Sequence, residues 1–333
     1  VRDYAGLGAL DEALGRAERI EGWRQGVIFA DLAGELARVG RTEEAWSLIR
    51  RAEEIRQSIR GWQNPRIAAH IGQSLALLGD VEESRRIAME LIAYDGQQYT
   101  GRSVAVIAAG YASRGRFDEA MEEVARLDGT QDLYDNWWRT VGLIGVARET
   151  GLSEEQRLQA LHEARETAAG VDGWKRAEAL AGIAEEYGRL GQRKPARRIL
   201  KEADGMVLPL DDALPVKAVL LSNLAGAWAA AGEPGRARSL LERAEPLVAN
   251  AMDIERPGAW AGVAEGYAAA GAEDDARRVY GLALAAAESL VNARPRALAL
   301  VAVCRSMSRS ERGLDENVTA RLDSLYDSLG EPW

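Results

Sequence analysis

Glycine recurs along this chain at a spacing that restricts the fold to a series of short helical units. The glycines stand 32, 39, 36, 36, 40, 41 and 39 residues apart, at Gly8, Gly40, Gly79, Gly115, Gly151, Gly191, Gly232 and Gly271. Each one follows an apolar stretch with helical periodicity and precedes a second such stretch. Glycine after a helix accepts the left-handed backbone of a tight turn. The sequence therefore predicts tandem helix–turn–helix units.

Small residues stand at two fixed distances from these glycines. Five residues after the glycine, the chain carries Ala45, Ser84, Ala120, Ala196, Ala237 and Ala276. Seven residues before it stand Ala33, Gly72, Ala108, Ala184, Ala225 and Ala264. Two helices that cross closely leave room only for small side chains, so we expect the two helices of each unit to cross at these positions.

Large residues occupy two further positions of the unit. Eight residues before the glycine stand the expected core side chains Leu32, Ile71, Ile107, Leu143, Ile183, Leu224 and Val263. Four residues before it stand Leu36, Leu75, Tyr111, Tyr187, Trp228 and Tyr267. This order of large, small, aromatic, Gly and Ala resembles the signature of the tetratricopeptide repeat, over residues 5–290.

The resemblance implies an all-α fold, a right-handed α-α superhelix, or solenoid, of about seven to eight helix–turn–helix repeats. The units are longer than the family's usual length of about 34 residues, so pitch and groove width do not carry over. The extra length is expected in the second helix, whose end the sequence marks with Gly22, Gly61, Gly96, Gly129, Gly173 or Gly205. The fourth unit is the least regular, and its Ser153 and Gln156 predict a capping box.

The sequence predicts one repeat solenoid over residues 1–313, followed by a capping helix and tail over 314–333. Val318, Leu322, Leu325 and Leu329 recur at helical spacing in that last segment, and an end repeat needs a cover for its apolar face. The segment 205–215 holds Pro209 and Pro215 and is the longest expected connection. It could divide the solenoid into two rigid arcs, or pack as a loop along the edge.

Charge and motif content exclude several classes of function. The chain has 42 basic and 52 acidic residues, a net charge of −10, which disfavours nucleic acid and anionic membranes as partners. Phosphate-binding loops and metalloprotease or hydrolase motifs are absent from the sequence, and two histidines with one cysteine cannot assemble the usual zinc sites. We therefore expect no catalytic residue, metal or cofactor. Cys304 follows an apolar run, so we expect its thiol to be buried.

No apolar run in the sequence is long enough to span a membrane, so no membrane insertion is expected. Cytoplasm is the default compartment. The chain begins at Val1 rather than Met, so a leader or a preceding domain could have been removed.

The resemblance places a partner along the first helix of each unit, which lines the groove in that family. Ten residues before each glycine stand Ala30, Ala69, Ala105, Val141, Ala181, Ser222 and Ala261, which we expect to form a smooth surface that another backbone could approach. The candidate contact residues near them are Arg66, His70, Gln73, Arg102, Trp138, Arg139 and Asn223. The alternative is that they are ordinary solvated helix residues.

The expected ligand is a protein or peptide with an acidic segment, because the early candidates are basic. The later part of the same face carries Glu178, Glu185 and Glu265. Tryptophans that open first helices, at Trp23, Trp62 and Trp174, could either attach a helix start to the preceding unit or stack on a ligand.

The leading hypothesis is a protein- or peptide-binding scaffold that is not an enzyme. One alternative is the sensor or regulatory region of a larger ATPase or transcription regulator. Another is an α/α-toroid enzyme, which the likeness of the units and the lack of a singular polar cluster disfavour.

Overall fold

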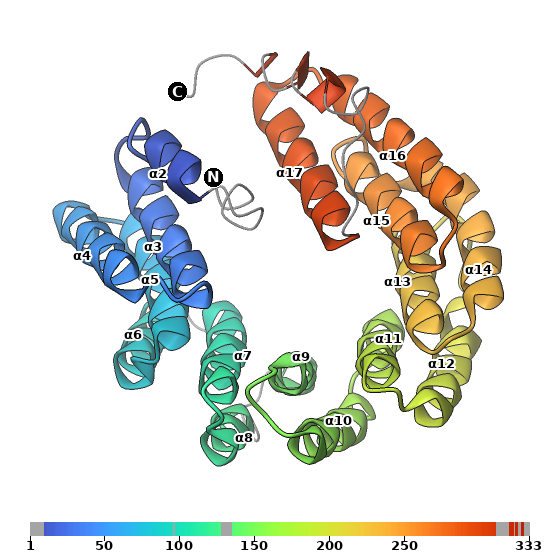
Figure 1. The fold of residues 1–333 in the computed structure, drawn as a ribbon, viewed down its shortest axis with the longest axis horizontal. Coiled ribbons are helices and arrows are strands. Elements are labelled where there is room, and N and C mark those ends of the chain that lie inside the picture. The colour runs from blue at the N-terminus through green and yellow to red at the C-terminus, as the bar shows by residue number, and fades with distance from the viewer. Residues whose placement is uncertain are drawn as a thin grey trace. The chain divides into compact units, whose positions relative to one another are not determined.

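The computed structural model of the protein describes residues 10–95, 97–127, 135–310, 320–322, 324–325 and 328–329, and every regular element within them is helical (Figure 1). The helices up to residue 171 are α2 Leu10–Ala17, α3 Trp23–Arg38, α4 Thr42–Ser58, α5 Gln63–Leu78, α6 Val81–Asp95, α7 Gln97–Ser113, α8 Phe117–Ala125, α9 Asp135–Arg148 and α10 Glu154–Ala168. Those beyond it are α11 Gly173–Arg189, α12 Arg193–Val207, α13 Val216–Ala230, α14 Pro234–Leu247, the short 3-10 helix η1 Val248–Asn250, α15 Arg256–Ala269, α16 Glu273–Glu288 and α17 Ala293–Arg309.

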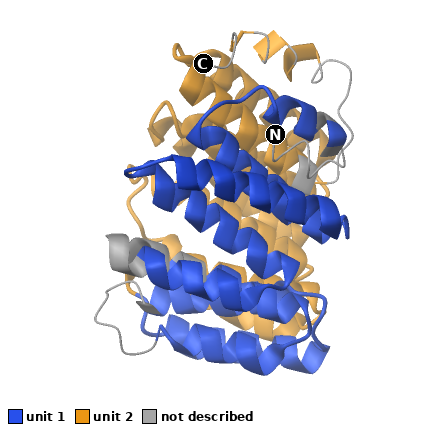
Figure 2. Cartoon of the chain, turned by 90° about the vertical axis from the view of Figure 1, so that its left-hand side faces the viewer, with its two compact units in different colours: residues 1–171 blue, residues 172–333 orange. Residues whose placement is uncertain are grey.

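The chain forms two compact units, residues 1–171 and residues 172–333 (Figure 2). In the first unit the helices pair as α3–α4, α5–α6, α7–α8 and α9–α10, and α3, α5, α7 and α9 pack in that order. In the second unit the pairs are α11–α12, α13–α14 and α15–α16, and α11, α13, α15 and α17 pack in order. Each described unit is thus a stack of helical hairpins, and the predicted all-α repeat fold is confirmed.

The predicted turn glycines lie between the two helices of a hairpin. Six of them have a left-handed backbone, with φ from 72° to 90°, at Gly40, Gly79, Gly115, Gly191, Gly232 and Gly271. Any other residue would be strained there. Gly8 lies outside the described residues.

The glycine of the fourth hairpin has a different role. The predicted capping box is present, because the Ser153 hydroxyl accepts from the backbone of Gln156 and the Gln156 side chain accepts from that of Ser153. A Cβ atom on Gly151 would lie 2.6 Å from the carbonyl oxygen of Ser113, at the end of α7. Glycine is needed here because two backbones approach closely.

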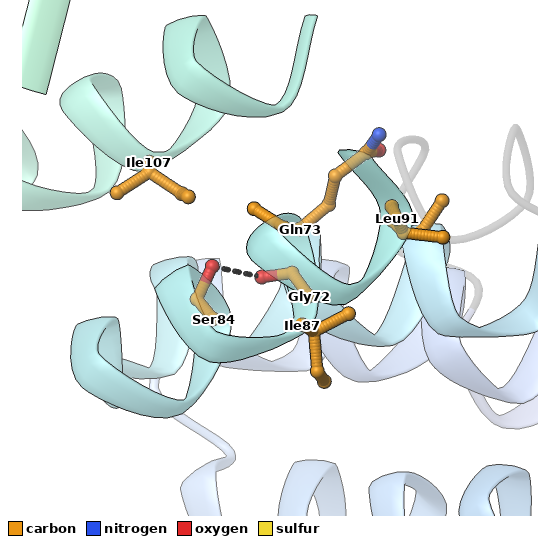
Figure 3. Close-up of a pocket in the computed structure, with 8 residues that line it drawn as sticks. Gly72, Gln73, Ser84, Ile87, Leu91 and Ile107 are labelled. Atoms are coloured by element: carbon orange, nitrogen blue, oxygen red, sulfur yellow. Dashed lines mark hydrogen bonds between the residues drawn. The ribbon is translucent and has the colours of Figure 1, made fainter. Parts of the chain in front are cut away.

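The predicted helix crossings are confirmed by burial and, in one hairpin, by a hydrogen bond. The alanines five residues after the turn glycines, from Ala45 to Ala276, are at most 1% exposed. Ser84 replaces alanine in the second hairpin, and its hydroxyl donates to the carbonyl of Gly72 at 2.6 Å (Figure 3). Gly72 is the small residue predicted on the facing helix, so both predicted positions meet at one contact.

The residues ten positions before each glycine do not form an open surface, and that prediction is wrong for most of them. Ala30, Ala69, Ala105, Ala181, Ser222 and Ala261 are at most 9% exposed. Ser74 of α5 donates to the carbonyl of Ala30, and Ser306 of α17 donates to that of Ala261. These small residues are buried because neighbouring first helices pack against them.

Two local predictions also differ from the structure. Gly205 does not end its helix, because α12 continues to Val207. Cys304 is half-buried rather than buried, because the buried side of α17 runs through Leu300, Val303 and Met307, and Cys304 lies at the margin of that stripe.

The connection after α12 is held to the helix that follows it. The Lys217 side chain is 2% exposed, and its ammonium group donates to the carbonyl of Leu208 at 3.3 Å and to that of Leu210, while it also pairs with Asp212. A division of the solenoid at 205–215 stays a prediction.

The predicted capping helix lies largely outside the described residues. In its described part, Leu325 is 3% exposed and Arg321 pairs with Glu288 of α16 at 2.9 Å. Among the described helices, none has the length and apolar character needed to cross a lipid bilayer.

Candidate functional site

Three of the predicted contact residues share one face of α5. Arg66, His70 and Gln73 follow one another at spacings of four and three residues, so their side chains leave the helix on the same side. Arg66 is exposed, and the other two are partly exposed. We call this surface the α5 face. It is the part of the predicted site that the fold assembles.

Two tryptophans extend the α5 face at its N-terminal end. Trp23 begins α3 and Trp62 immediately precedes α5, and their ring centroids lie 5.5 Å apart with an interplanar angle of 64°. The guanidinium carbon of Arg66 lies 5.6 Å from the centroid of each ring. We call Trp23, Trp62 and Arg66 the tryptophan cluster. Trp62 thus joins its helix to the preceding hairpin, as one of the two predicted roles requires.

The tryptophan cluster also keeps a large apolar surface in contact with solvent. Trp62 is 55% exposed although its ring packs on that of Trp23. Arg24 stacks on Trp23 with its guanidinium carbon 5.0 Å from the ring centroid. Cation–π contacts at exposed sites contribute about 0.5–1 kcal/mol each and hold the rings in place. The two rings therefore form an ordered aromatic surface, with the guanidinium groups of Arg24 and Arg66 against it.

His70 connects the α5 face to α3. Its Nδ1 lies 2.7 Å from the Asp31 carboxylate, and the two side chains are 25% and 14% exposed. This contact fixes the orientation of the imidazole ring, because one ring nitrogen is held by the carboxylate. His70 therefore presents a fixed polar edge one turn beyond Arg66.

Gln73 lies at the other end of the α5 face. It lines a hollow of about 10 Å³ together with Gly72, Ser84, Ile87 and Ile107. That volume holds about one water molecule, so the hollow is not a ligand pocket. In Figure 3 the Gln73 side chain extends away from Ser84.

The predicted residues of α7 and α9 do not all join the α5 face. The side chain of Arg102 lies outside the described residues. Arg139 turns toward the second helix of its own hairpin, where it pairs with Glu163 of α10 at 2.7 Å and lines a polar hollow of about 460 Å³. Arg139 therefore lies on another surface than Arg66.

Trp138 packs against the bare backbone of α7. A Cβ atom on Gly101 would lie 2.2 Å from the indole ring, so the ring occupies the space that a side chain would take. The rest of Trp138 is partly exposed. Its position is explained by packing between α7 and α9, and a contact with a partner stays a prediction.

Asn223 belongs to the second unit, where it is exposed on α13 one turn after Val219. Val219 is 41% exposed. The acidic residues of the same face lie on α11 and α15, and Glu185 pairs with Arg189 at 2.6 Å.

Glu178 of α11 should make stability depend on pH. Burial raises the pKa of its carboxyl group, and the nearby charge of Lys175 opposes the rise. Because the pKa of Glu178 is higher in the folded than in the unfolded chain, its protonated form contributes stability that is fully present below the unfolded pKa of about 4.3. That stability is lost as pH rises through the folded pKa. Glu178→Gln is therefore expected to raise the melting temperature near pH 7 and to leave it unchanged near pH 3.5. An equal gain at both pH values would show that ionisation is not the cause.

The sequence did not lead us to a cleft of about 400 Å³ between α4 and α6. Its apolar lining comes from Trp46, Ile49, Ile71, Leu75 and Ile87. The available signal was Leu75, which occupies a position where four of the later units carry Tyr or Trp. In the part of the chain that the structure describes, no group of three or more His, Cys, Asp or Glu side chains is placed to hold a metal ion.

Comparisons with known proteins find remote likeness to solved structures. No protein-family model matches the sequence, and no curated protein matches it. A Rap protein complexed with competence and sporulation factor is similar with 14% identity and a TM-score of 0.39, over 98% of this chain and 95% of that one. Ton1535 from Thermococcus onnurineus NA1 has 14% identity and a TM-score of 0.31, over 89% and 84%. BtubC from P. vanneervenii has 15% identity and a TM-score of 0.30, over 74% and 90%. At TM-scores below 0.5, these likenesses place no constraint on the function of this chain.

Proposed function

We propose that the protein is a binding module, not an enzyme, and that it holds an extended protein or peptide segment on the α5 face and the tryptophan cluster. The observation that carries the proposal is the exposure of Trp62, 55%, in a ring pair that is already ordered by Trp23 and Arg66. Rigid exposed aromatic side chains are the commonest anchors of protein interfaces, because they bury a large area at a small cost in conformational entropy.

The chemistry of the surface favours an apolar or aromatic side chain next to a carboxylate in the ligand. The Trp62 ring offers the apolar contact, the guanidinium group of Arg66 lies beside it, and that of Arg24 lies against the neighbouring Trp23 ring. A carboxylate of the ligand can pair with either group, whereas a basic ligand would be repelled. Gln73, which is partly exposed, offers hydrogen bonds further along the helix.

The test uses a displayed library of random peptides that is selected on the full chain. Selected peptides are expected to combine Asp or Glu with an apolar residue, and their affinity can then be measured by fluorescence anisotropy over a salt series. Trp62→Ala should weaken binding about tenfold or more at every salt concentration. Arg66→Glu should weaken it by less and flatten the salt dependence, because exposed ion pairs contribute about 0.2–1 kcal/mol.

The matched control is Arg198→Glu, which makes the same change of charge at an exposed position on α12. It should leave affinity unchanged. Selected peptides without acidic residues, or wild-type affinity in both Trp62→Ala and Arg66→Glu, would refute the α5 face as the binding site.

A further inference from the structure

In three hairpins, a buried aromatic side chain of the first helix reaches the second helix of the preceding hairpin. The rings are Tyr111, Trp228 and Tyr267, each four residues before its turn glycine and at most 5% exposed. Each ring also donates a hydrogen bond to a carboxylate on the second helix of the preceding hairpin. Tyr111 donates to Glu82 at 3.3 Å, Trp228 to Asp204 at 3.2 Å and Tyr267 to Glu245 at 2.6 Å.

The second hairpin has no ring at this position. Leu75 stands there, and the cleft of about 400 Å³ lies over it, between α4 and α6. The apolar lining of the cleft comprises Ile49, Ile71, Leu75 and Ile87, each at most 6% exposed, and the partly exposed ring of Trp46 at its side. The cleft thus lies beside the position at which three other hairpins carry the buried rings of Tyr111, Trp228 and Tyr267.

The carboxylate that would accept from such a ring is nevertheless present. Glu53 lines the cleft from α4 and stands 13 residues after Gly40. Asp204 and Glu245 also stand 13 residues after their turn glycines, Gly191 and Gly232. Arg56 holds the Glu53 carboxylate in place through contacts of 2.6 and 2.7 Å. The second hairpin therefore has the carboxylate acceptor, Glu53, but carries Leu75 where the other three hairpins carry the aromatic donor.

We propose that this cleft binds a tyrosine or tryptophan side chain of a partner polypeptide, with its hydroxyl or indole N–H group donating to Glu53. The neighbouring residues of that polypeptide are basic. The charged side chains that line the cleft comprise four acids, Glu53, Glu54, Asp80 and Glu83, and one base, Arg50. Arg56 and Arg86 pair with Glu53 and Glu83, so the remaining acidic charge comes from Glu54 and Asp80. Lysine or arginine beside the aromatic residue complements this charge.

This site is separate from the proposed function, because its lining comes from α4, α6 and the side of α5 that faces them. The two sites also select opposite charges. The tryptophan cluster carries arginine and favours an acidic ligand, whereas the cleft favours a basic one.

The experiment uses three capped pentapeptides, Gly-Arg-X-Arg-Gly with X as Tyr, Phe or Leu, and the full chain with labelled isoleucine methyl groups. Titration by NMR is expected to shift the methyl resonances of Ile49, Ile71 and Ile87 with the Tyr peptide. The Phe peptide should bind about three- to tenfold more weakly, because it cannot donate to Glu53, and the Leu peptide should bind more weakly still. Equal affinity for all three peptides would overturn the proposal.

Two variants test the geometry. Glu53→Gln should remove most of the preference for Tyr over Phe. Glu53 is partly exposed, so the variant is expected to fold, and circular dichroism can confirm this. Leu75→Tyr should place the missing ring inside the cleft, raise the melting temperature and abolish peptide binding. An unchanged Tyr preference in Glu53→Gln, or undiminished binding in folded Leu75→Tyr, would each count against the site.

A third variant separates this proposal from the preceding one. Trp62→Ala should leave binding of the Tyr peptide unchanged, because Trp62 does not line the cleft. Loss of binding in Trp62→Ala with no shifts at the cleft isoleucines would assign the peptide to the tryptophan cluster and refute the cleft.

Discussion

Replacing Ala237 with Leu is expected to lower the free energy of unfolding by about 1–3 kcal/mol, because extra methylene groups in a closely packed helix crossing force the backbones apart. Ala237 stands five residues after the turn glycine Gly232, on α14, and is 0% exposed. Ala225 of α13, also 0% exposed, stands at the facing position of the predicted crossing. Chemical denaturation followed by circular dichroism would measure the loss.

The control for Ala237 is Ala285→Leu. Ala285 is exposed on α16, so the same added volume meets no neighbour and the expected change is within about 0.5 kcal/mol. Equal stability of the two variants would mean that the small residues do not mark a tight crossing. Ala196→Leu should behave like Ala237→Leu, since Ala196 stands at the same position of its own hairpin and is also 0% exposed.

Two glycine-to-alanine substitutions in the second unit should change stability in opposite directions. A Cβ atom on Gly188 of α11 would lie 2.7 Å from the carbonyl group of Ala230, at the end of α13. Backbone atoms cannot yield as a flexible side chain can, so Gly188→Ala should destabilise by about 1–3 kcal/mol. A Cβ atom on Gly226, in the interior of α13, would meet no atom within 4 Å. Gly226→Ala should therefore stabilise by about 1 kcal/mol, because alanine is the better helix former.

Thermal and urea unfolding of the two glycine variants would check both signs. The pair is informative because the substitution is identical and both glycines lie within helices. If Gly188→Ala were neutral, the close approach of α11 and α13 would be wrong. If Gly226→Ala were destabilising, the conclusion that a Cβ atom on Gly226 has open space beside α13 would be wrong.

Local chemistry made the repeat predictable from the sequence. The turn at Gly40 depends on one backbone conformation that glycine alone adopts easily, and the crossing at Ala237 depends on one side-chain volume. The capping box of Ser153 and Gln156 depends on residues three apart. Each of these requirements is met by residues within one hairpin, so the residue pattern reveals it.

Contacts between hairpins were less predictable, because they depend on how one helix pair is rotated and shifted against the next. Ala30, for example, is buried where its carbonyl accepts from Ser74, a residue of the following hairpin. Arg66 and Arg139 both looked like members of one basic row, yet Arg139 pairs with Glu163. A one-residue difference in helical position turns a side chain by about 100°, enough to move it to another surface.

The sequence by itself determined the hairpins, their turns and the positions where two helices cross. Only the tertiary structure decided which polar residues share a surface, so that Arg66 joins Trp23 and Trp62 while Arg139 does not. The tertiary structure also revealed the cleft beside Leu75. The sequence shows that this position has leucine in place of an aromatic residue, but it does not show the cleft. The physical reason is that turns and crossings are set by single residues and volumes, whereas a binding surface is set by the packing of several helices that are distant in the sequence.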